Sequence, residues 1–333
     1  MEKEEENKHK LAHCLILPYP IQGHINPMLQ FSKRLAHNGI KITLATTKHL
    51  FTTTAKEFSD RWISVETISD GFDEGQKDEA LKTYLERFQQ VGTKTLVGLL
   101  EKLRDLGCPV DCLIYDPFLP WGLAVAKKFG LLGAPSFTQL SYVNNMPSFV
   151  RDPKSHAGSF ELLVNQFQNI ENADFVFVNS VYELEPEATD WMAKLLPVKT
   201  IGPTIPSMYL DKRLPQDKNY GLNIFKPINA CMKWLDERAN GSVIYVSFGS
   251  MAKLEREQMM ELALAMKITS HQRNPNSLKL LQQIYTLEKG LIVSWSPQLE
   301  VLAYGAIGCF VTHCGWNSML EALSLGVPMV AVP

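Results

Sequence analysis

The sequence predicts an α/β fold in which strands and helices alternate and the strands pair in parallel. Residues 11–18, LAHCLILP, form an unbroken apolar run, which is typical of a strand buried on both faces of a sheet. A helical apolar stripe that stops at Gly39 follows, and then a second apolar run over 40–46. This strand-helix-strand order is the unit of an open parallel sheet. Because the alternation starts again at 242, we expect two α/β halves.

The first half continues the pattern beyond 46. Short apolar runs predict strands over 62–68, 111–116, 175–180 and 198–203. Periodic apolar residues predict a helix over 78–107, broken near Gly92, and another over 121–130 that ends at a glycine. Residues 139–160 are rich in Asn, Ser, Pro and Gly and predict no clear element.

A polar, proline-rich stretch over 203–227 separates the two halves. Beyond it we expect strands over 242–250, 290–295, 307–313 and 327–333, and helices over 254–267, 297–305 and 318–326. Residues 267–288 lie where another strand is expected but carry no clean apolar run. We therefore predict a tail over 1–10, an N-terminal domain over 11–205, a linker over 206–230 and a partial C-terminal domain over 231–333.

Composition narrows the class of protein. The chain has 333 residues, with 33 Lys plus Arg against 35 Asp plus Glu, and this near-neutral balance argues against a nucleic-acid partner. No apolar run reaches the roughly 18 residues of a membrane span, and the charged start MEKEEENKHK is not a signal peptide. Six cysteines without a CxxC pair indicate buried free thiols in a reducing compartment. We expect a cytoplasmic monomer.

The stretch THCGWNSMLEAL, residues 312–323, is typical of a nucleotide site. A strand ends, a glycine lets the backbone turn, and Asn317 and Ser318 open a helix whose free N–H groups attract phosphate. Glu321 lies one turn in, where a carboxylate can bind ribose hydroxyls, and Trp295 can offer its face to a base. A simple helix cap at Asn317 and Ser318 explains the same residues equally well.

The whole stretch 295–333 closely resembles the signature box of plant family-1 UDP-dependent glycosyltransferases. The segments PYPIQGHINPMLQFSKRLA, DCLIYDPFLPWGLAVAKKFG and WLDERANGSVIYVSFGS also resemble this family, most of all the branch that glucosylates small acids, thiohydroximates and terpenoid or phenolic aglycones. The resemblance implies a GT-B fold, with two Rossmann-like domains facing across a cleft. It also implies an enzyme of plant secondary metabolism that binds a small acceptor in its N-terminal half and UDP-glucose in its C-terminal half, without a metal.

The resemblance implies a catalytic pair. His24, in the GHINP loop, matches the general base of the family, and Asp116 matches the aspartate that orients it. A loop between a strand and a helix lies near a positive dipole end, which favours the neutral imidazole that a base needs. Asp116 would fix the tautomer and stabilise the imidazolium, as in a Ser-His-Asp triad. Without the resemblance, the two would be an ordinary loop histidine and a strand-ending turn residue.

The donor residues are likewise implied by the resemblance. Trp295 matches the residue that stacks on uracil, and the backbone of Ser296 matches the group that reads the uracil edge. Thr138 is matched, less closely, with a threonine that touches glucose. Gln298 and Glu321 match the ribose contacts, and the backbone of Trp316 matches a sugar contact. The diphosphate is assigned to His313, Asn317, Ser318 and Ser250.

Four departures from the family pattern bear on activity. The sequence stops at Pro333, before the Asp-Gln pair that binds the glucose hydroxyls in the family and before the last strands and helix of the fold. Residues 139–150 are shorter than in relatives, and 267–288 replace an apolar strand. We therefore weigh two interpretations: an inverting UDP-glucosyltransferase acting on a hydroxyl, carboxylate or thiol, or a catalytically inactive, truncated remnant. A dehydrogenase is discounted because residues 18–25, PYPIQGHI, lack the G-x-G-x-x-G pattern.

Overall fold

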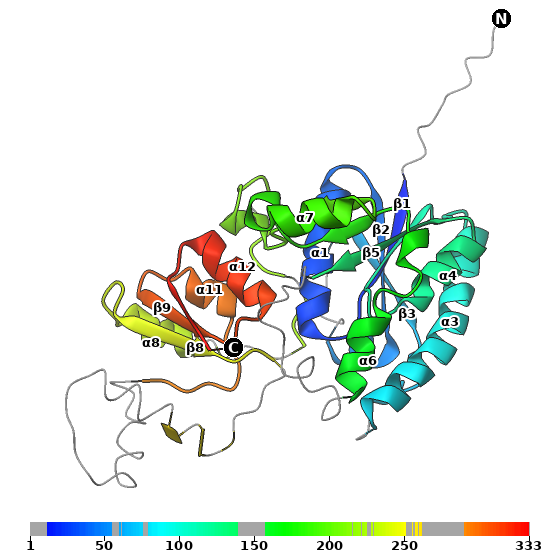
Figure 1. The fold of residues 1–333 in the computed structure, drawn as a ribbon. Coiled ribbons are helices and arrows are strands. Elements are labelled where there is room, and N and C mark those ends of the chain that lie inside the picture. Colours follow the sequence, from blue (N-terminus) through cyan, green and yellow to red (C-terminus); the bar gives the residue numbers. More distant parts are fainter. Residues whose placement is uncertain are drawn as a thin grey trace, which may run out of the picture. The chain divides into compact units, whose positions relative to one another are not determined.

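The computed structural model describes residues 12–54, 60, 62–75, 79–138, 157–214, 216–220, 222–224, 228, 230–250, 255, 257–258, 260–261 and 290–332. The chain divides into two compact units, residues 1–224 and 225–333, and both are α/β (Figure 1). The division falls inside residues 206–230, whose role as a linker stays a prediction.

Unit 1 is built on a parallel sheet with the order β3-β2-β1-β4-β5-β6-β7. The strands are β1 (His13–Leu17), β2 (Lys41–Thr47), β3 (Ile63–Ile68), β4 (Cys112–Tyr115), β5 (Leu132–Phe137), β6 (Val176–Val178) and β7 (Val198–Thr200). All five residues of β1 are buried, as expected for a strand covered on both faces. Since the order reverses at β1, the carboxyl ends of β1 and β4 mark the point where such sheets bind ligands.

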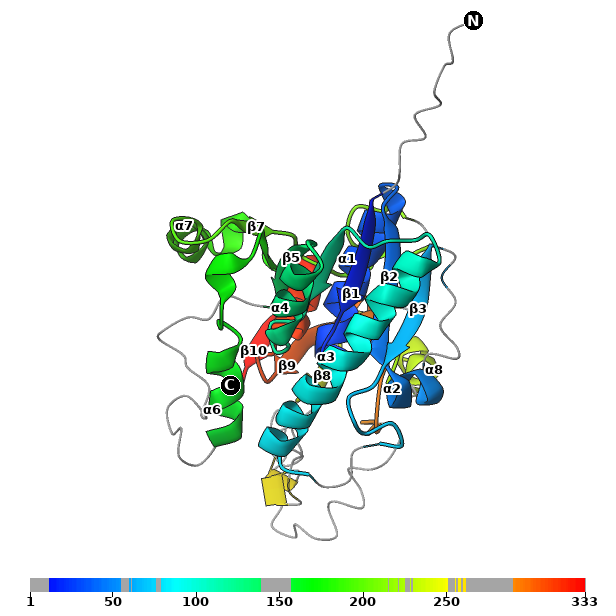
Figure 2. The same ribbon diagram turned by 90° about the vertical axis from the view of Figure 1, so that its right-hand side faces the viewer.

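Helices cover both faces of this sheet. They are α1 (Gln22–His37), α2 (Lys48–Thr53), α3 (Leu81–Asp105), α4 (Trp121–Lys128), α6 (Ala157–Asn165) and α7 (Pro186–Ala193), with short 3-10 turns η3 (Ile170–Asn172), η4 (Tyr182–Leu184) and η5 (Ser207–Tyr209). Leu15 and Leu17 point into a core shared with α3 and α4, whereas Ile16 points into a core shared with α1. Figure 2 shows α3 and α4 in front of the strands and α1 behind them.

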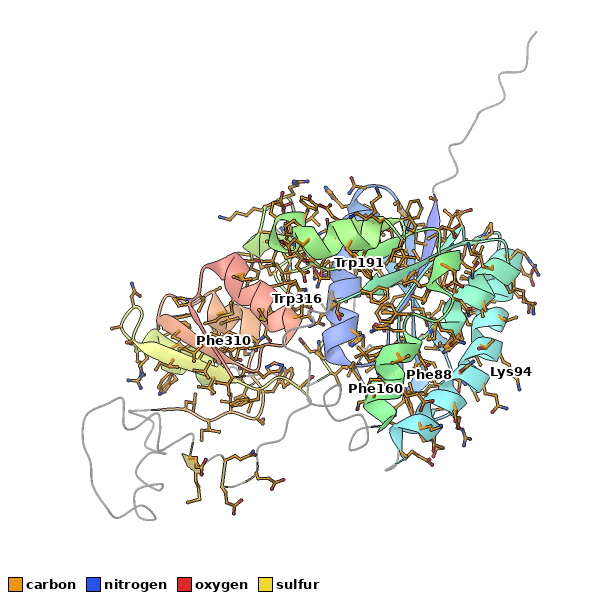
Figure 3. All side chains as sticks on the ribbon, in the orientation of Figure 1. Phe88, Lys94, Phe160, Trp191, Phe310 and Trp316 are labelled. Carbon is orange, nitrogen blue, oxygen red and sulfur yellow. The ribbon has the colours of Figure 1, made fainter. Side chains whose placement is uncertain are left out.

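Unit 2 carries a smaller parallel sheet with the order β10-β9-β8. Its described elements are α8 (Ala230–Asp236), β8 (Val243–Ser247), α11 (Gln298–Leu302), β9 (Ile307–Thr312), α12 (Trp316–Leu325) and β10 (Met329–Ala331). Phe310, labelled in Figure 3, lies on the central strand and is fully buried. Its ring stacks on that of Tyr245 with centroids 5.1 Å apart. The two residues are partners in the β8–β9 ladder, so their rings pack the two strands together.

Two helix predictions are wrong in their details. The predicted break at Gly92 does not occur, because α3 runs unbroken from Leu81 to Asp105. Close packing explains the glycine at 92, because a Cβ there would lie 2.8 Å from the Phe88 ring and 3.0 Å from Trp121. Helix α1 begins at Gln22 and runs through Pro27, whereas the sequence predicted a loop as far as that proline.

Two strand predictions also differ from the structure. Strand β5 was not predicted, because Gly133 and Pro135 disguise it. Gly133 lets the strand approach α4, where a Cβ would lie 2.6 Å from Leu123. Residues 290–295 form no strand, although Leu291 and Val293 still pack on the unit 2 core. An apolar run predicts burial, but it does not distinguish a hydrogen-bonded strand from an extended segment.

Several predictions fall on residues outside the described ranges. Outside the described residues lie the tail over 1–10, residues 139–156, most of the helix predicted over 254–267 and all of 267–288. All six cysteines are free, but only Cys14 and Cys231 are buried, and the other four are half-buried. In the ranges given above, no helix is both long and apolar enough to cross a membrane.

Candidate functional site

The first group of functional residues lies in unit 1, at the carboxyl ends of β1 and β4. His24 is in the first turn of α1 and not in a loop as predicted, and Asp116 directly follows β4. Because β1 and β4 are neighbours in the sheet, two residues 92 positions apart meet: His24 Nδ1 lies 2.6 Å from Asp116 Oδ2. The side chain of Asp116 is 1% exposed and that of His24 is 14% exposed, so only the imidazole reaches solvent.

Contacts around this pair fix its geometry. The second carboxylate oxygen of Asp116 accepts the Phe118 N–H at 2.9 Å, which locks the carboxylate. The Phe118 ring lies over the imidazole of His24 with centroids 4.7 Å apart, and the Tyr19 ring meets it edge-on at 5.8 Å. Since a carboxylate only accepts, Nδ1 carries the proton and Nε2 is the nitrogen that can take one.

Tyr19, one of the two aromatic residues beside His24, is kept neutral by its surroundings. Burial, together with the nearby carboxylates of Asp116 and Asp70, raises the pKa of Tyr19 to about 12. The Tyr19 phenol therefore stays protonated at neutral pH and adds no second negative charge beside His24. The pair thus has the features of a general base: an oriented imidazole, a buried carboxylate behind it and a largely aromatic wall.

The second group lies in unit 2, where α11 meets α12. Gln298 donates from Nε2 to Ser318 Oγ and to Glu321 Oε2, both at 2.9 Å. Tyr245, on β8, lies 2.9 Å from Ser296 Oγ and donates to Gln298 Oε1 at 3.3 Å. Ser318 and Glu321 are buried. The structure therefore joins four of the predicted donor residues in one hydrogen-bond network.

Tyr245 was not among the predicted site residues. It lies in an apolar strand, and its only signal is a polar tip inside the run SVIYVSFGS. Burial raises its pKa, so its hydroxyl remains a donor. Its ring is part of the core and its hydroxyl is part of the network, and the sequence shows only the first role.

His313 lies between two glycines just after β9. A Cβ at Gly249 would approach its Nε2 to 2.6 Å, and one at Gly315 to 2.4 Å. Gly249 has a φ of +76°, which also favours glycine. The Nδ1 of His313 is buried and has no hydrogen-bond partner among the described residues. The imidazole of His313 therefore packs closely against the backbone at both glycines.

Helix α12 starts directly after this histidine. Its N-cap is Gly315, and no side chain caps it, so Asn317 and Ser318 lie inside the first turn and the helix-cap interpretation is wrong. The N–H groups of a first turn have no partner within the helix, and they lie at the positive end of its dipole. Trp316 occupies the first helical position (Figure 3).

The remaining predicted residues are placed less tightly. Trp295 is half-buried in the segment before α11, and its carbonyl accepts the Ile228 N–H at 2.9 Å. Ser250 is exposed beyond β8, and Thr138 is half-buried directly after β5. In the described part of the chain, no hydrogen bond links Ser250 or Thr138 to either group. Within the same ranges, no cluster of three or more His, Cys, Asp or Glu side chains is arranged to hold a metal ion.

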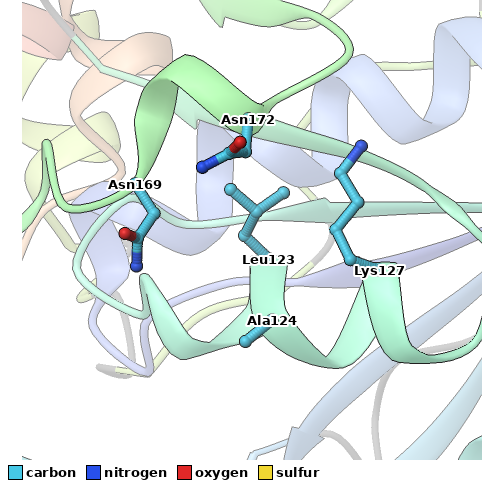
Figure 4. A pocket seen from close by; sticks show the side chains of 5 residues that line it. All are labelled: Leu123, Ala124, Lys127, Asn169 and Asn172. Carbon is cyan, nitrogen blue, oxygen red and sulfur yellow. The ribbon is translucent and has the colours of Figure 1, made fainter.

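A surface pocket in unit 1 lies apart from these residues. Figure 4 shows it between α4 and the η3 turn, lined by Leu123, Ala124, Lys127, Asn169 and Asn172. It includes none of the predicted site residues, and Lys127 is already paired with Asp174 at 2.7 Å. We therefore do not assign a ligand to it.

Comparison with known proteins places these features in a family. Residues 223–333 match the family model described as UDP-glucoronosyl and UDP-glucosyl transferase. UDP-glycosyltransferase 74F2 from Arabidopsis thaliana is 45% identical over 362 residues, covering 98% of this chain and 80% of that protein. Flavonol 7-O-beta-glucosyltransferase UGT74F1 from the same plant is 44% identical, covering 97% of this chain and 80% of its own length.

A solved structure shows the same architecture. Os79 from O. sativa in complex with UDP matches with a TM-score of 0.87 and 36% identity, covering 96% of this chain and 81% of that one. Os79 has also been solved with U2F and trichothecene. Fold and site therefore define a GT-B glycosyltransferase that uses a UDP-sugar donor and a small-molecule acceptor.

The chain belongs to the UDP-glycosyltransferase family. It is shorter than its relatives within the matched span. The alignment with 74F2 is 362 positions long, whereas this chain has 333 residues. The relative therefore carries residues inside that span that this chain lacks.

Proposed function

We propose that this chain transfers glucose from UDP-glucose to a small hydrophobic acceptor, with inversion at the anomeric carbon and His24 as general base. The single observation that carries the proposal is the 2.6 Å contact between His24 Nδ1 and the buried Asp116 carboxylate. It leaves Nε2 as the accepting nitrogen of a partly exposed imidazole. Names of relatives, including flavonol 7-O-beta-glucosyltransferase, support glucose as the sugar.

The proposed step is one displacement. Nε2 of His24 takes the proton of the acceptor hydroxyl or thiol while the acceptor atom forms its bond to the anomeric carbon. The bond from that carbon to the phosphate oxygen breaks, and UDP leaves with the electron pair. Asp116 stabilises the imidazolium that forms. The product is a β-glucoside, or a glucose ester when the acceptor is a carboxylate, which is already an anion and depends less on His24.

The donor half of the proposal rests on unit 2. His313 and the first turn of α12 follow β9 directly, and we assign the diphosphate to them because the positive end of a helix dipole attracts anions. We assign the ribose hydroxyls to Gln298 and Glu321 and the uracil to the face of Trp295. The leaving diphosphate gains charge during the displacement, so donors placed there in advance lower the barrier.

A thermal unfolding scan with and without UDP-glucose tests the donor site. A ligand at a hundred times its Kd stabilises the folded chain by about 2.7 kcal/mol, so the unfolding transition should move to higher temperature. A cooperative transition that does not move would contradict the donor assignment and favour the inactive remnant. The longer alignment with 74F2 is the observation that keeps this second interpretation open.

A transfer assay tests the base. The wild-type chain, His24→Ala and the matched control His37→Ala are incubated with UDP-glucose and a flavonol, and the glucoside is measured by chromatography. His37 lies on the same helix but is exposed, so its replacement should leave the rate unchanged. We expect His24→Ala to lose about 10²–10⁴-fold in kcat. Equal rates for all three proteins would exclude His24 as the base.

A further inference from the structure

One stripe of helix α1 holds the chain segment that leads out of unit 1. The polar residues Gln22, Asn26, Gln30, Lys33 and Arg34 recur at about one-turn spacing, so they share one side of the helix. All except Asn26 bond directly to the described residues between 201 and 224, and Asn26 accepts from Gln22.

The far end of the stripe binds the start of that segment. Arg34 donates to three carbonyl oxygens, those of Ile201 at 3.2 Å, Pro203 at 2.6 Å and Ile205 at 3.2 Å. Burial is the largest of several effects on the pKa of Arg34 and lowers it, so the three carbonyl groups bind a poorly solvated cation. Three backbone acceptors on one guanidinium fix both the position and the direction of the segment.

The middle of the stripe binds the next stretch. Lys33 Nζ lies 2.7 Å from Asp217 Oδ1, and both side chains are largely buried. The same ammonium donates to the carbonyl of Asn219 at 2.9 Å, and Gln30 Nε2 donates to that carbonyl at 3.1 Å. A largely buried ion pair that also holds a backbone carbonyl is more than a solvated surface contact.

The near end of the stripe is Gln22, and it binds the last residues of unit 1. Its Nε2 donates to the Leu222 carbonyl at 2.9 Å, and its Oε1 accepts the Ile224 N–H at 2.6 Å. Leu222 is 2% exposed and packs with Ile224 on the same core as α1. Unit 2 begins at residue 225. One glutamine therefore grips the backbone on both sides of residue 223, just before the chain leaves the unit.

We propose that Gln22 is a positioning residue for sugar transfer. It lies in the same helical turn as His24, and it fixes the point from which the chain continues into unit 2. The segment that leads into the proposed UDP-binding unit is thereby held by the same helix that carries His24. This inference rests on the proposed function. It predicts that loss of the Gln22 contacts slows transfer while UDP binding and the His24–Asp116 pair remain.

Two substitutions separate the two contacts of Gln22. Gln22→Met keeps the length of the side chain and removes its hydrogen bonds to Leu222 and Ile224, together with the one to Asn26. Gln22→Glu keeps the acceptor for Ile224 N–H but faces the Leu222 carbonyl with a carboxylate, which repels it until it is protonated. Gln90→Met is the matched control, because Gln90 is exposed on α3.

Three measurements are made on the full chain: hydrogen exchange at Ile224, the Kd of UDP, and kcat with UDP-glucose and a flavonol. For Gln22→Met we expect exchange at Ile224 to be about tenfold faster, a drop in kcat of about fivefold or more and a UDP Kd within about twofold of wild type. For Gln22→Glu we expect protected Ile224 and a kcat that recovers relative to wild type as the pH falls. A change that only destabilised the fold would also weaken UDP binding, so an unchanged UDP Kd separates the positioning role from a structural one.

Several results would overturn the inference. Unchanged exchange at Ile224 in Gln22→Met would show that the grip does not hold the segment. Faster exchange with unchanged kcat would show that the grip has no part in transfer. If Gln22→Met does not fold, Ile224→Pro removes the same N–H from the other side, and its kcat and UDP Kd then decide, since proline leaves no amide hydrogen to exchange at 224. If the wild-type chain transfers no sugar, the proposed function fails, and exchange at Ile224 then judges the grip by itself.

Discussion

Asp116→Asn tests whether the buried carboxylate sets the chemistry of His24. Asparagine has almost the same shape, and its carbonyl oxygen can still accept the Phe118 N–H that now binds Asp116 at 2.9 Å. Its amide nitrogen, however, then faces His24 Nδ1 across the present 2.6 Å contact. An amide N–H donates, so the imidazole must turn its lone pair toward the new amide and keep its proton on Nε2. The nitrogen that should take the acceptor proton is then already protonated.

The expected size of the effect follows from this contact. A hydrogen bond to a charged group contributes about 1.5–3 kcal/mol, and about 1.4 kcal/mol is a factor of ten in rate. Loss of the imidazolium partner alone therefore costs about ten- to a hundredfold in kcat. The wrong tautomer adds to this, since the same substitution costs about 10⁴-fold in a serine protease triad. We expect kcat to fall by about 10²–10⁴ for a hydroxyl acceptor.

The assay compares two acceptors at saturating UDP-glucose. A flavonol must lose a proton, whereas benzoate is already an anion, so Asp116→Asn should slow flavonol transfer much more than benzoate transfer. Asp105→Asn, an exposed change on the same unit, is the control, and the Kd of UDP should stay within about twofold of wild type. A variant that keeps flavonol kcat within about threefold of wild type would refute the proposed role of the pair.

Two further changes test other parts of the molecule. Gly315→Ala places a Cβ 2.4 Å from His313 Nε2 and must displace the imidazole, so titration with UDP should show an affinity about tenfold weaker or worse. The control is Gly98→Ala, where a Cβ meets nothing within 4 Å, and it should leave the UDP affinity unchanged. Equal UDP affinities for the two variants would contradict the assignment of His313. Burial lowers the pKa of His13 below its ordinary 6.5, so the unfolded chain binds more protons than the folded chain as the pH falls below that value. The stability that neutral His13 contributes is therefore present above pH 6.5 and is lost as the pH falls through the pKa of His13 in the folded chain. Urea unfolding at about pH 7.5 and about pH 5.5 should show a smaller pH difference for His13→Gln than for the exposed control His37→Gln, and equal differences would refute this.

Much of the fold could be predicted from the sequence because the hydrophobic pattern is local. The run over 11–18 predicts a doubly covered strand, and all of His13–Leu17 is buried. The predictions failed where a residue serves a distant partner. Gly92 looks like a helix break but makes room for Phe88 and Trp121, and Gly133 looks like a turn but lets β5 approach α4. No local pattern reports the neighbour that a glycine accommodates.

The candidate site divides in the same way. His24, Asp116 and the residues after β9 could be named as candidates because their continuous motifs resemble those of the family, and their roles stay predictions. The role of Tyr245 could not, because a tyrosine in an apolar strand predicts only burial, while its hydroxyl joins a network through Ser296 and Gln298.

The sequence by itself determined the alternation of strands and helices, the family and the identity of the residues that its motifs contain. Only the tertiary structure decided which of them touch. The strand order places β1 beside β4, and this brings His24 to Asp116 across 92 positions. Gln22 meets backbone atoms 200 and 202 positions away. Since backbone N–H and C=O groups are the same in every residue type except proline, no sequence pattern can name them as partners.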